Sequence, residues 1–396
     1  MRLRNIFEIC LGFILIMLNK MNEYDYEVVV IGAGVIGLSV AYSLSKTGIN
    51  SVLVIEKEDS FGRKTSSRNS EVIHSGIYYP KNSLKTKHCL QGRKLLYDFC
   101  IENDVWFNKC GKLITCQKGQ EKELLELYKN SKKNKIKDIK IINRAEVQKI
   151  EPFISSEMAL LIKCTGIVSS HTLMERLFNS SKNADHDFLF KTEFLEAEKL
   201  DRGYKIFLNN SINTIESLKT KWVVNAAGLQ SDLVSKKIDD EIKAPRLTFS
   251  KGNYFKLKPK WRNCFKHLVY PLPDKINNTL GIHLTIDQNG DAKLGPDAFL
   301  MNNKTEDYSV EERLIDKFYD EARRYIIGLK KSDMTPDYSG IRPKIMSKNK
   351  VSSDFYISNE IKYGHKGLIN LIGIESPGLT SALSIGREVK NLILKS

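Results

Sequence analysis

The sequence predicts an α/β fold, α+β overall, in which a Rossmann-like nucleotide-binding domain is assembled from separated segments and joined to a mainly antiparallel β domain with helices. Three observations support this prediction: a strand, glycine turn, helix and second strand near the N-terminus, alternating strands in the middle of the chain, and a buried strand followed by a helix at the end. With 396 residues, of which 41% are hydrophobic, the chain can bury two domain cores.

The first unit begins with a strand-like run at residues 26–31 and turns through Gly32-Ala-Gly-Val-Ile-Gly37 into a helix. Gly32 permits the tight turn, Gly34 lets the backbone approach a pyrophosphate, and Gly37 lets the helix pack closely on the strand. The free N–H groups at the start of the helix favour phosphate. A second strand then ends at Glu56, whose carboxylate can accept hydrogen bonds from ribose hydroxyls. The unit predicts a site for the adenosine diphosphate half of a dinucleotide.

Two later segments also read as a buried strand that breaks into small residues before a helix. One ends at Asn225-Ala-Ala-Gly228, and the other contains Glu375-Ser-Pro-Gly-Leu-Thr380. Three such junctions, near residues 31, 225 and 374, could together bind one long cofactor. A nicotinamide enzyme usually completes its nucleotide domain in one contiguous block, so the arrangement favours a flavin with an adenosine diphosphate tail.

The middle of the chain differs from both ends. Residues 245–300 carry alternating strand patterns, residues 84–100 and 310–330 have helical spacing, and residues 120–150 are rich in Lys and Glu, as in exposed helices. These patterns predict an N-terminal extension, an FAD-binding domain and a substrate domain. The predicted boundaries are 1–23 for the extension, 24–100, 150–240 and 335–396 for the FAD-binding domain, and 101–149 and 241–334 for the substrate domain.

Composition excludes several function classes. The formal charge of +15 favours anionic partners, but the lysines are scattered and no basic block with interleaved aromatics indicates nucleic acid. The seven cysteines are odd in number, widely spaced and without a CxxC pair, so neither a disulfide framework nor a zinc site is predicted. No histidine–carboxylate cluster has metal-ligand spacing. We therefore expect no metal, no nucleic-acid partner and a reducing compartment.

The N-terminus has two interpretations. Met1-Arg-Leu-Arg precedes an apolar run at residues 9–18, as in the first parts of a signal peptide, but no small-residue cleavage site follows. The run is also short for a bilayer span. We favour an over-extended gene start with Met21 as the natural first residue; a short peripheral anchor at the inner face of a membrane is the competing interpretation. The expected location is cytoplasmic, or mitochondrial in a eukaryote.

The segment Thr65-Ser-Ser-Arg-Asn-Ser-Glu-Val-Ile-His-Ser-Gly-Ile-Tyr-Tyr-Pro80 resembles the signature loop of the L-2-hydroxyglutarate dehydrogenase/oxidase family, in the D-amino-acid-oxidase-like flavoprotein superfamily. The resemblance implies FAD-dependent oxidation of an L-2-hydroxy acid, L-2-hydroxyglutarate above all, to the 2-oxo acid by hydride transfer to flavin N5. It also implies an electron acceptor, a quinone or oxygen. The similarity runs from about residue 25 to the end and includes Tyr270-Pro-Leu-Pro-Asp274, Gly281-Ile-His-Leu-Thr285, Gly340-Ile-Arg-Pro343 and Glu375-Ser-Pro-Gly-Leu-Thr-Ser-Ala-Leu383.

The resemblance also assigns residues to the cofactor. Hydroxyls and a guanidinium suit phosphate oxygens, and glycine lets backbone N–H groups approach the flavin ring. The residues assigned in this way are Thr65, Ser66, Ser67 and Arg68 at the diphosphate and ribityl chain, Gly228 near the dinucleotide, and Gly378, Leu379 and Thr380 at the ring.

Oxidation of a 2-hydroxy acid needs a base for the hydroxyl proton, and histidine titrates in the useful range. His74 lies within the signature loop and His283 on a strand expected to line the same cavity; the sequence does not separate these two candidates. Arg342 is the candidate anchor for the substrate carboxylate, because a guanidinium can bind it bidentately. The candidates for a second polar contact to a five-carbon diacid are Lys251, Tyr254 and Thr285.

Two other functions fit part of the pattern. An amine-oxidising relative, acting on a D-amino acid, glycine or a sarcosine-like compound, would share the FAD site. The alternative from another class is a flavin-carrying protein that binds a partner without turnover, which the positive charge mildly supports.

Overall fold

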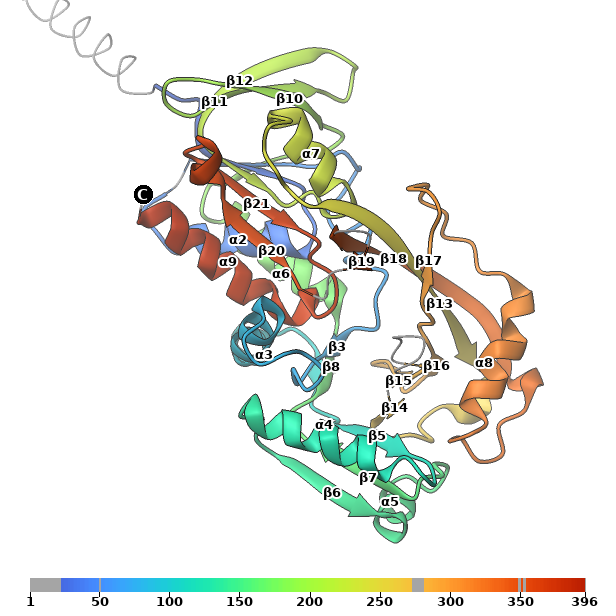
Figure 1. The fold of residues 1–396 in the computed structure, drawn as a ribbon. Helices are drawn as coiled ribbons and strands as arrows, with labels where there is room; N and C mark the ends of the chain where they lie inside the picture. The colour runs from blue at the N-terminus through green and yellow to red at the C-terminus, as the bar shows by residue number, and fades with distance from the viewer. Residues whose placement is uncertain (1–22, 50, 273–280, 348–349, 352–353, 396) are drawn as a thin grey trace, which may run out of the picture.

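The computed structural model describes residues 23–395, with gaps at residues 50, 273–280, 348–349 and 352–353. Residues 1–22 of the predicted extension and the end of the Tyr270–Asp274 motif lie outside the described residues. The described strands form two large sheets and a small one (Figure 1). The mixture of a largely parallel sheet with helices and a second, mainly antiparallel sheet confirms the predicted fold class.

The first sheet has eight strands in the order β10-β11-β12-β1-β2-β9, with β21 beside β12 and β20 beside β21. Strand β1 lies parallel to β2 and β12, and β12 lies parallel to β21. The strands are β1 (Tyr26–Ile31), β2 (Val52–Ile55), β9 (Asp187–Leu189), β10 (Glu193–Lys199), β11 (Tyr204–Asn209), β12 (Ile215–Asn225), β20 (Tyr356–Asn359) and β21 (Leu368–Ile372).

Strand β1 is buried on both faces, as expected for a parallel strand covered by other layers. Val28 and Val30 belong to the core that the sheet shares with four helices, whereas Val29 and Ile31 belong to a second core on the opposite face. This double burial explains the continuous apolar run. The four helices are α2 (Val35–Leu44), α3 (Leu84–Glu102), α6 (Ser170–Lys182) and α9 (Gly378–Leu394); α7 (Ser231–Ile238) packs in the second core.

The second sheet has ten strands in the order β19-β18-β13-β16-β15-β14-β5-β7-β6, with β17 beside β13. It is antiparallel except where β14 meets β5. The strands are β5 (Lys112–Cys116), β6 (Ile139–Asn143), β7 (Met158–Ile162), β13 (Arg246–Leu257), β14 (Leu268–Pro271), β15 (Leu284–Ile286), β16 (Ala292–Leu294), β17 (Phe299–Leu300), β18 (Met334–Ser347) and β19 (Lys350–Val351).

Smaller elements complete the two parts. Helices α4 (Glu121–Lys133) and α5 (Arg144–Ile150) lie against β5, β6 and β7, and α8 (Ile315–Ala322) packs near β18. The small sheet joins β3 (Val72–Ile73), β8 (Gly166–Val168) and β4 (Phe107–Asn108). Short 3-10 turns occur at Gly228–Gln230, Pro259–Trp261, Glu312–Leu314, Lys331–Asp333 and Glu360–Tyr363.

Three strands differ from the sequence prediction. β6 interrupts a region expected to be helical, because its short half-buried run is held by pairing with β7. β7 and β18 fall in segments assigned to the FAD-binding domain, yet both pair in the ten-stranded sheet. β18 pairs with β13 almost along its whole length, and the two long strands run between the two parts of the molecule (Figure 1). Such long-range pairing leaves no local pattern in the sequence.

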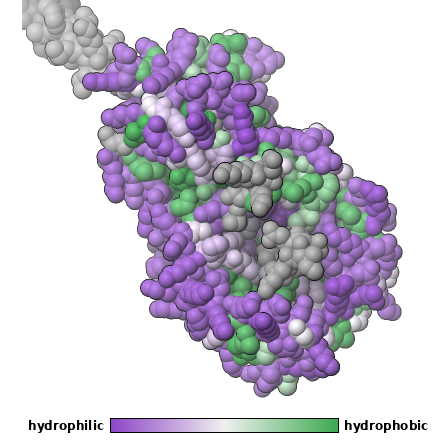
Figure 2. Space-filling model, in the orientation of Figure 1, coloured by the Kyte–Doolittle hydropathy of each residue, from purple (hydrophilic) through white to green (hydrophobic). Residues whose placement is uncertain are grey.

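The surface and the thiols agree with the composition. The face drawn in Figure 2 is mainly hydrophilic with scattered apolar patches. The six cysteines of the described residues are free, whereas Cys10 lies outside them. In the part of the chain that the structure describes, no helix is both long and apolar enough to cross a membrane.

Candidate active site

Three strand-to-helix junctions meet at one edge of the first sheet. β1 ends at Ile31 opposite Asn225 of β12, and Asn225 lies opposite Asn370 of β21. The carboxyl ends of these parallel strands therefore lie side by side, which is where open α/β sheets bind ligands. A single cavity extends from this edge to the second sheet, and its lining includes Gly32 at one end and His283 at the other.

The glycine turn is shaped for close backbone approach. Gly32 has φ +103°, and a Cβ there would lie 2.7 Å from the carbonyl oxygen of Ala226. Gly34 lines the cavity, whereas Gly37 does not: a side chain at Gly37 would collide with the carbonyl oxygen of Gly32. Gly32 thus lets the turn lie close to the end of β12, Gly34 leaves room for a pyrophosphate, and Gly37 lets α2 pack on β1.

Glu56 lies at the cavity wall directly after β2. Its Oε2 accepts a hydrogen bond from the Ala33 N–H at 2.9 Å, and its Oε1 accepts one from the Glu58 N–H at 3.0 Å. Two backbone donors therefore fix the carboxylate beside the glycine turn. Each oxygen keeps a further lone pair for a ribose hydroxyl, so the residue fits the adenosine end of FAD.

The loop after β2 contributes hydroxyls, but not all of them face the cavity. Ser66 Oγ accepts from the Val35 N–H at 3.0 Å at the start of α2, and Thr65 Oγ1 donates to the Ile341 carbonyl at 2.9 Å. Thr65, Ser66 and Arg68 line the cavity. Ser67 does not; its hydroxyl donates to the Gly62 carbonyl inside the loop, which gives it a structural role.

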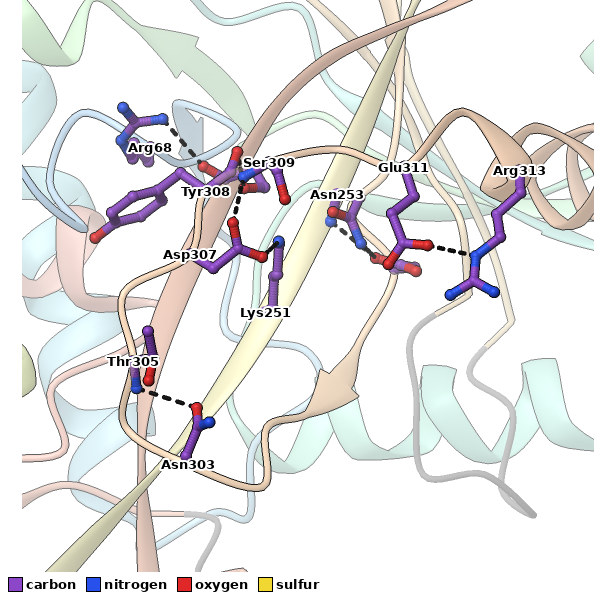
Figure 3. Close-up of polar contacts among 12 residues, drawn as sticks. Arg68, Lys251, Asn253, Asn303, Thr305, Asp307, Tyr308, Ser309, Glu311 and Arg313 are labelled. Carbon is purple, nitrogen blue, oxygen red and sulfur yellow. Dashed lines mark hydrogen bonds and ion pairs between the residues drawn. The ribbon is translucent and has the colours of Figure 1, made fainter.

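A strap at residues 303–309 crosses beside this loop (Figure 3). The Arg68 guanidinium lies 4.2 Å from the centre of the Tyr308 ring, and Glu306, which lines the cavity, is 2.9 Å from Lys64 Nζ. Lys251 Nζ is 2.7 Å from Asp307 Oδ2. Lys251 therefore points to the strap and is not among the described residues that line the cavity, contrary to its predicted substrate contact.

Strand alternation explains the position of Lys251. On β13, Ser250 lies opposite Arg342 and Gly252 opposite Gly340, whereas Lys251 lies opposite Ile341. Directly opposed residues project to the same face of a sheet. Arg342 therefore shares its face with Ser250 and Gly252, and Lys251 projects to the other face.

The cavity wall also carries five ring or guanidinium side chains: His74, His283, Arg342, Tyr254 and Tyr270. His74 Nε2 lies 3.3 Å from Ser376 Oγ, and the imidazole of His283 stacks on Tyr270 with ring centres 3.7 Å apart. Arg342 Nη2 donates to the Asp297 carbonyl at 2.7 Å. The two candidate bases and the candidate anchor thus come together from β18, the signature loop and the segment before β15.

Two other predicted residues lie away from the cavity lining. Thr380 is buried in α9, where its Oγ1 accepts from the His74 N–H at 3.0 Å and donates to the Val72 carbonyl at 3.2 Å. Thr380 therefore positions the histidine loop, while Gly378 and Leu379 line the cavity, as does Gly228. Thr285 is buried opposite Lys293 on β16 and is likewise not among the described lining residues.

Both cavity histidines have a lowered pKa. Burial, followed by the charge of Lys112, lowers the pKa of His74 well below its ordinary value. For His283, burial again dominates, and Lys112, His74 and Arg342 add to the lowering of its pKa. A neutral imidazole is the form that can accept a proton. Burial also raises the pKa of the Tyr254 phenol, whose OH lies 2.8 Å from Ser70 Oγ.

Sequence reasoning missed a buried cluster and a glycine. Glu375 Oε1 accepts from both Lys85 Nζ and Lys344 Nζ at 2.7 Å. Burial opposes ionisation of Glu375, but the two ammonium groups outweigh it, so its pKa is lowered. Nothing local marks these lysines in a lysine-rich chain. Gly252 was also missed: a Cβ there would lie 2.6 Å from Arg342 Nη2.

Three further histidines bond to residues that do not line this cavity. His88 Nδ1 is 3.0 Å from Ser384 Oγ, His267 pairs with Glu151, and His365 pairs with Asp239. Within the described residues there is no cluster of His, Cys, Asp and Glu that could hold a metal ion.

Known proteins share this architecture. The mitochondrial L-2-hydroxyglutarate dehydrogenase of Arabidopsis thaliana is 36% identical over 93% of this chain and 83% of its own length. A glycerol 3-phosphate dehydrogenase of Caloramator mitchellensis is 30% identical over 93% of this chain and 74% of its own. The solved structure of L-alpha-glycerophosphate oxidase from Mycoplasma pneumoniae, with FAD bound, aligns with a TM-score of 0.82 at 24% identity, covering 93% and 94% of the two chains.

The family assignment follows from the length of the match. Residues 27–392 match the DAO family, described as FAD dependent oxidoreductase. Three features fit the adenosine diphosphate tail of FAD. They are the glycine turn, the fixed Glu56 carboxylate, and the loop that carries Thr65, Ser66 and Arg68. The chain therefore belongs to the DAO family of FAD-dependent oxidoreductases, with FAD as its cofactor.

Proposed function

We propose that this chain oxidises an L-2-hydroxy acid, L-2-hydroxyglutarate in the first place, to the corresponding 2-oxo acid. The observation that carries the proposal is the meeting of His74, His283 and Arg342 in the cavity that Gly32, Gly34 and Glu56 also line. The Arabidopsis, Dictyostelium and Bos taurus relatives at 33–36% identity, all named L-2-hydroxyglutarate dehydrogenase, support it.

Each residue has a defined part in this reaction. Arg342 binds the substrate carboxylate next to the reacting carbon, and the carbonyl of Asp297 fixes one of its nitrogens. A neutral imidazole of His74 or His283 accepts the hydroxyl proton. When bound, FAD would supply the acceptor for the hydride, which carries two electrons. The rings of Tyr254 and Tyr270 exclude water from the cavity wall.

The charge of the wall favours an anionic substrate. Lys112 and Arg342 both lie near the histidines, and the carboxylate of Glu375 is matched by Lys85 and Lys344. A dicarboxylate balances this excess of positive charge better than a zwitterionic amino acid does. We propose that the distal carboxylate of a five-carbon diacid contacts Tyr254, which lines the same cavity as Arg342.

A second candidate is oxidation of the C2 hydroxyl of glycerol 3-phosphate. The 30% identical Caloramator relative supports it, and a phosphate ester also suits a positive wall. The same base and anchor would serve, with the guanidinium on phosphate oxygens.

An anaerobic substrate panel separates the candidates. The FAD-loaded protein is mixed with L-2-hydroxyglutarate, D-2-hydroxyglutarate, glycerol 3-phosphate, glycine and D-alanine, and the visible flavin absorbance is followed. Bleaching by L-2-hydroxyglutarate alone is the expected result. Bleaching by glycerol 3-phosphate or by an amino acid moves the assignment to that class, and a flavin that stays oxidised throughout favours a carrier without turnover.

The electron acceptor and the cellular location of the protein can also be tested. Reoxidation of the reduced protein by a soluble quinone faster than by dissolved oxygen identifies a dehydrogenase; the reverse identifies an oxidase. Because the named L-2-hydroxyglutarate dehydrogenase relatives are mitochondrial, we propose a mitochondrial location, which subcellular fractionation with an antibody against this chain tests.

A further inference from the structure

Lys112, the first residue of β5, is a buried cation without a polar partner. Its side chain is fully buried, and Nζ has no hydrogen-bond partner among the described residues. The strand pairs Lys112 with Leu268 and Ile162, which hold it inside the ten-stranded sheet. An ammonium without a counter-ion is costly to bury.

Aromatic rings take the place of a counter-ion. Lys112 Nζ lies 3.6 Å from the centre of the Tyr270 ring and 5.7 Å from the centre of the Tyr78 ring. The negative face of an aromatic ring attracts a cation at such distances, and the attraction grows when both are desolvated. Tyr270 is therefore the main partner of the Lys112 ammonium.

His283 occupies the other face of the same ring. Its imidazole is nearly parallel to Tyr270, at 9°, with the ring centres 3.7 Å apart. An ammonium 3.6 Å from the centre and an imidazole 3.7 Å from it would overlap if they shared one face, so they lie on opposite faces. The ammonium nitrogen is therefore at most 7.3 Å from the centre of the imidazole.

We propose that Lys112 is a positioning residue for proton transfer: its cation, on the far face of Tyr270, keeps His283 neutral and able to accept a proton. Protonation of His283 would place a second cation against the Tyr270 ring. The two cations would repel each other, and the low dielectric of the interior would strengthen this repulsion. This inference rests on the proposed function for its use in catalysis, but its electrostatic part is a property of the chain alone.

The charged groups around the pair act in the same direction. Burial is the main cause of the lowered pKa of His283, and Lys112, His74 and Arg342 follow. Burial also lowers the pKa of Lys112 to about 7, against the opposing influence of three thiols. Lys112 is thus charged at the acidic pH values where a histidine would titrate. The thiols belong to Cys89, Cys110 and Cys164.

Removal of the Lys112 charge changes the pKa of His283 in a defined direction. Because the Lys112 cation lowers the pKa of His283, its removal must raise that pKa toward the ordinary histidine value. His283 is then protonated, and lost as a base, at a higher pH. The acid limb of the pH–rate profile moves to higher pH, while the rate on the alkaline side is little changed.

The test uses the FAD-loaded full chain with histidine-specific isotope labels. The NMR titration of His283, assigned with a His283→Gln variant, is compared between wild type and Lys112→Met. We expect the midpoint to rise by about one pH unit in Lys112→Met. Lys109→Met, which removes an exposed lysine three residues earlier, is the matched control and leaves the midpoint unchanged.

Two further variants guard against misfolding. Lys112→Gln removes the charge but keeps a polar side chain, and Tyr270→Phe keeps both the ring and the cation. We expect Lys112→Gln to shift the midpoint as Lys112→Met does, and Tyr270→Phe to leave it within a few tenths of a unit. Thermal melting identifies any variant that has lost its fold. If either Lys112→Met or Lys112→Gln is unfolded, the His283 midpoint of the other one decides whether the inference holds.

The kinetic readout separates this inference from the proposed function. With L-2-hydroxyglutarate, the acid limb of flavin reduction in Lys112→Met should rise by the same amount as the NMR midpoint. An unchanged midpoint in a folded Lys112→Met overturns the inference even if the substrate reduces the flavin. A shifted midpoint in a protein that L-2-hydroxyglutarate does not reduce overturns the proposed substrate and leaves the electrostatic role of Lys112 standing.

Discussion

Gly252 makes room for the guanidinium of Arg342. A methyl group at Gly252 would lie 2.6 Å from Arg342 Nη2 and 2.7 Å from Pro296 Cβ, so Gly252→Ala must displace the anchor. We expect the KM for the 2-hydroxy acid to rise about tenfold, because small displacements of a binding group are costly. Steady-state kinetics at constant flavin content measure it. Gly48→Ala, with nothing within 4 Å of its Cβ, is the control. An unchanged KM in Gly252→Ala would contradict the placement of Arg342.

Gly37 sets the distance between α2 and the glycine turn. A side chain there collides with the carbonyl oxygen of Gly32 and comes within 3.4 Å of Val30 Cγ1. We expect Gly37→Ala to lower the free energy of unfolding by about 1–3 kcal/mol and to copurify with less FAD. Chemical denaturation and the flavin-to-protein absorbance ratio measure the two effects. A variant with wild-type stability and full flavin content would show that the helix can move away without loss.

The neutral histidines make stability depend on pH. The pKa values of His74 and His283 are lowered in the folded protein, so the unfolded chain binds these protons more readily. The free energy of unfolding should therefore fall as the pH drops below about 6.5, by up to ~1.4 kcal/mol per pH unit for each histidine. Urea unfolding between about pH 5 and 7.5 measures the slope. His283→Gln should have a shallower slope than wild type; an identical slope would mean that His283 titrates alike in both states.

The strap at residues 303–309 is expected to help retain FAD. Asp307 pairs with the buried Lys251 (Figure 3). Glu306 lines the cavity and pairs with Lys64. Asp307→Asn leaves the Lys251 ammonium without its carboxylate and should weaken FAD binding about two- to fivefold. Flavin fluorescence on dilution measures the Kd.

The control for the strap is a neighbouring pair in the same view. Glu311 pairs with Arg313 just after the strap (Figure 3). Both residues are exposed, and neither is among the residues that line the cavity. Glu311→Gln should leave the Kd for FAD unchanged. Equal weakening in both variants would indicate a general loss of order in this segment rather than a specific clasp on the cofactor.

The sequence predicts the parts of this site whose chemistry is local. Gly32, Gly34 and Glu56 stand out because their residue types and spacing are dictated by one turn between two strands. His74 and Arg342 were found through motifs, and the structure brings both to one cavity wall. The motifs thus led to residues that share one cavity, although no local pattern specifies its geometry.

The rest depends on pairing between distant strands. Lys251 was expected to contact substrate, but the register of β13 against β18 turns it to the strap. Ser67 and Thr380 carry the right hydroxyls for a cofactor, yet both bond to backbone groups nearby. Lys112 lies in a strand that carries no motif, and only the contacts of Tyr270 with both Lys112 and His283 reveal its position near this histidine.

Single-turnover flavin reduction by L-2-hydroxyglutarate, in wild type and in Arg342→Met, tests the proposed reaction most directly. We expect fast, saturable bleaching in wild type. In Arg342→Met we expect an apparent Kd about a hundredfold higher at the same FAD content, because a charged bidentate contact is lost. The D-enantiomer should bleach neither protein. A wild-type flavin that stays oxidised, or an Arg342→Met variant that binds the substrate as tightly as wild type, would contradict the proposed function.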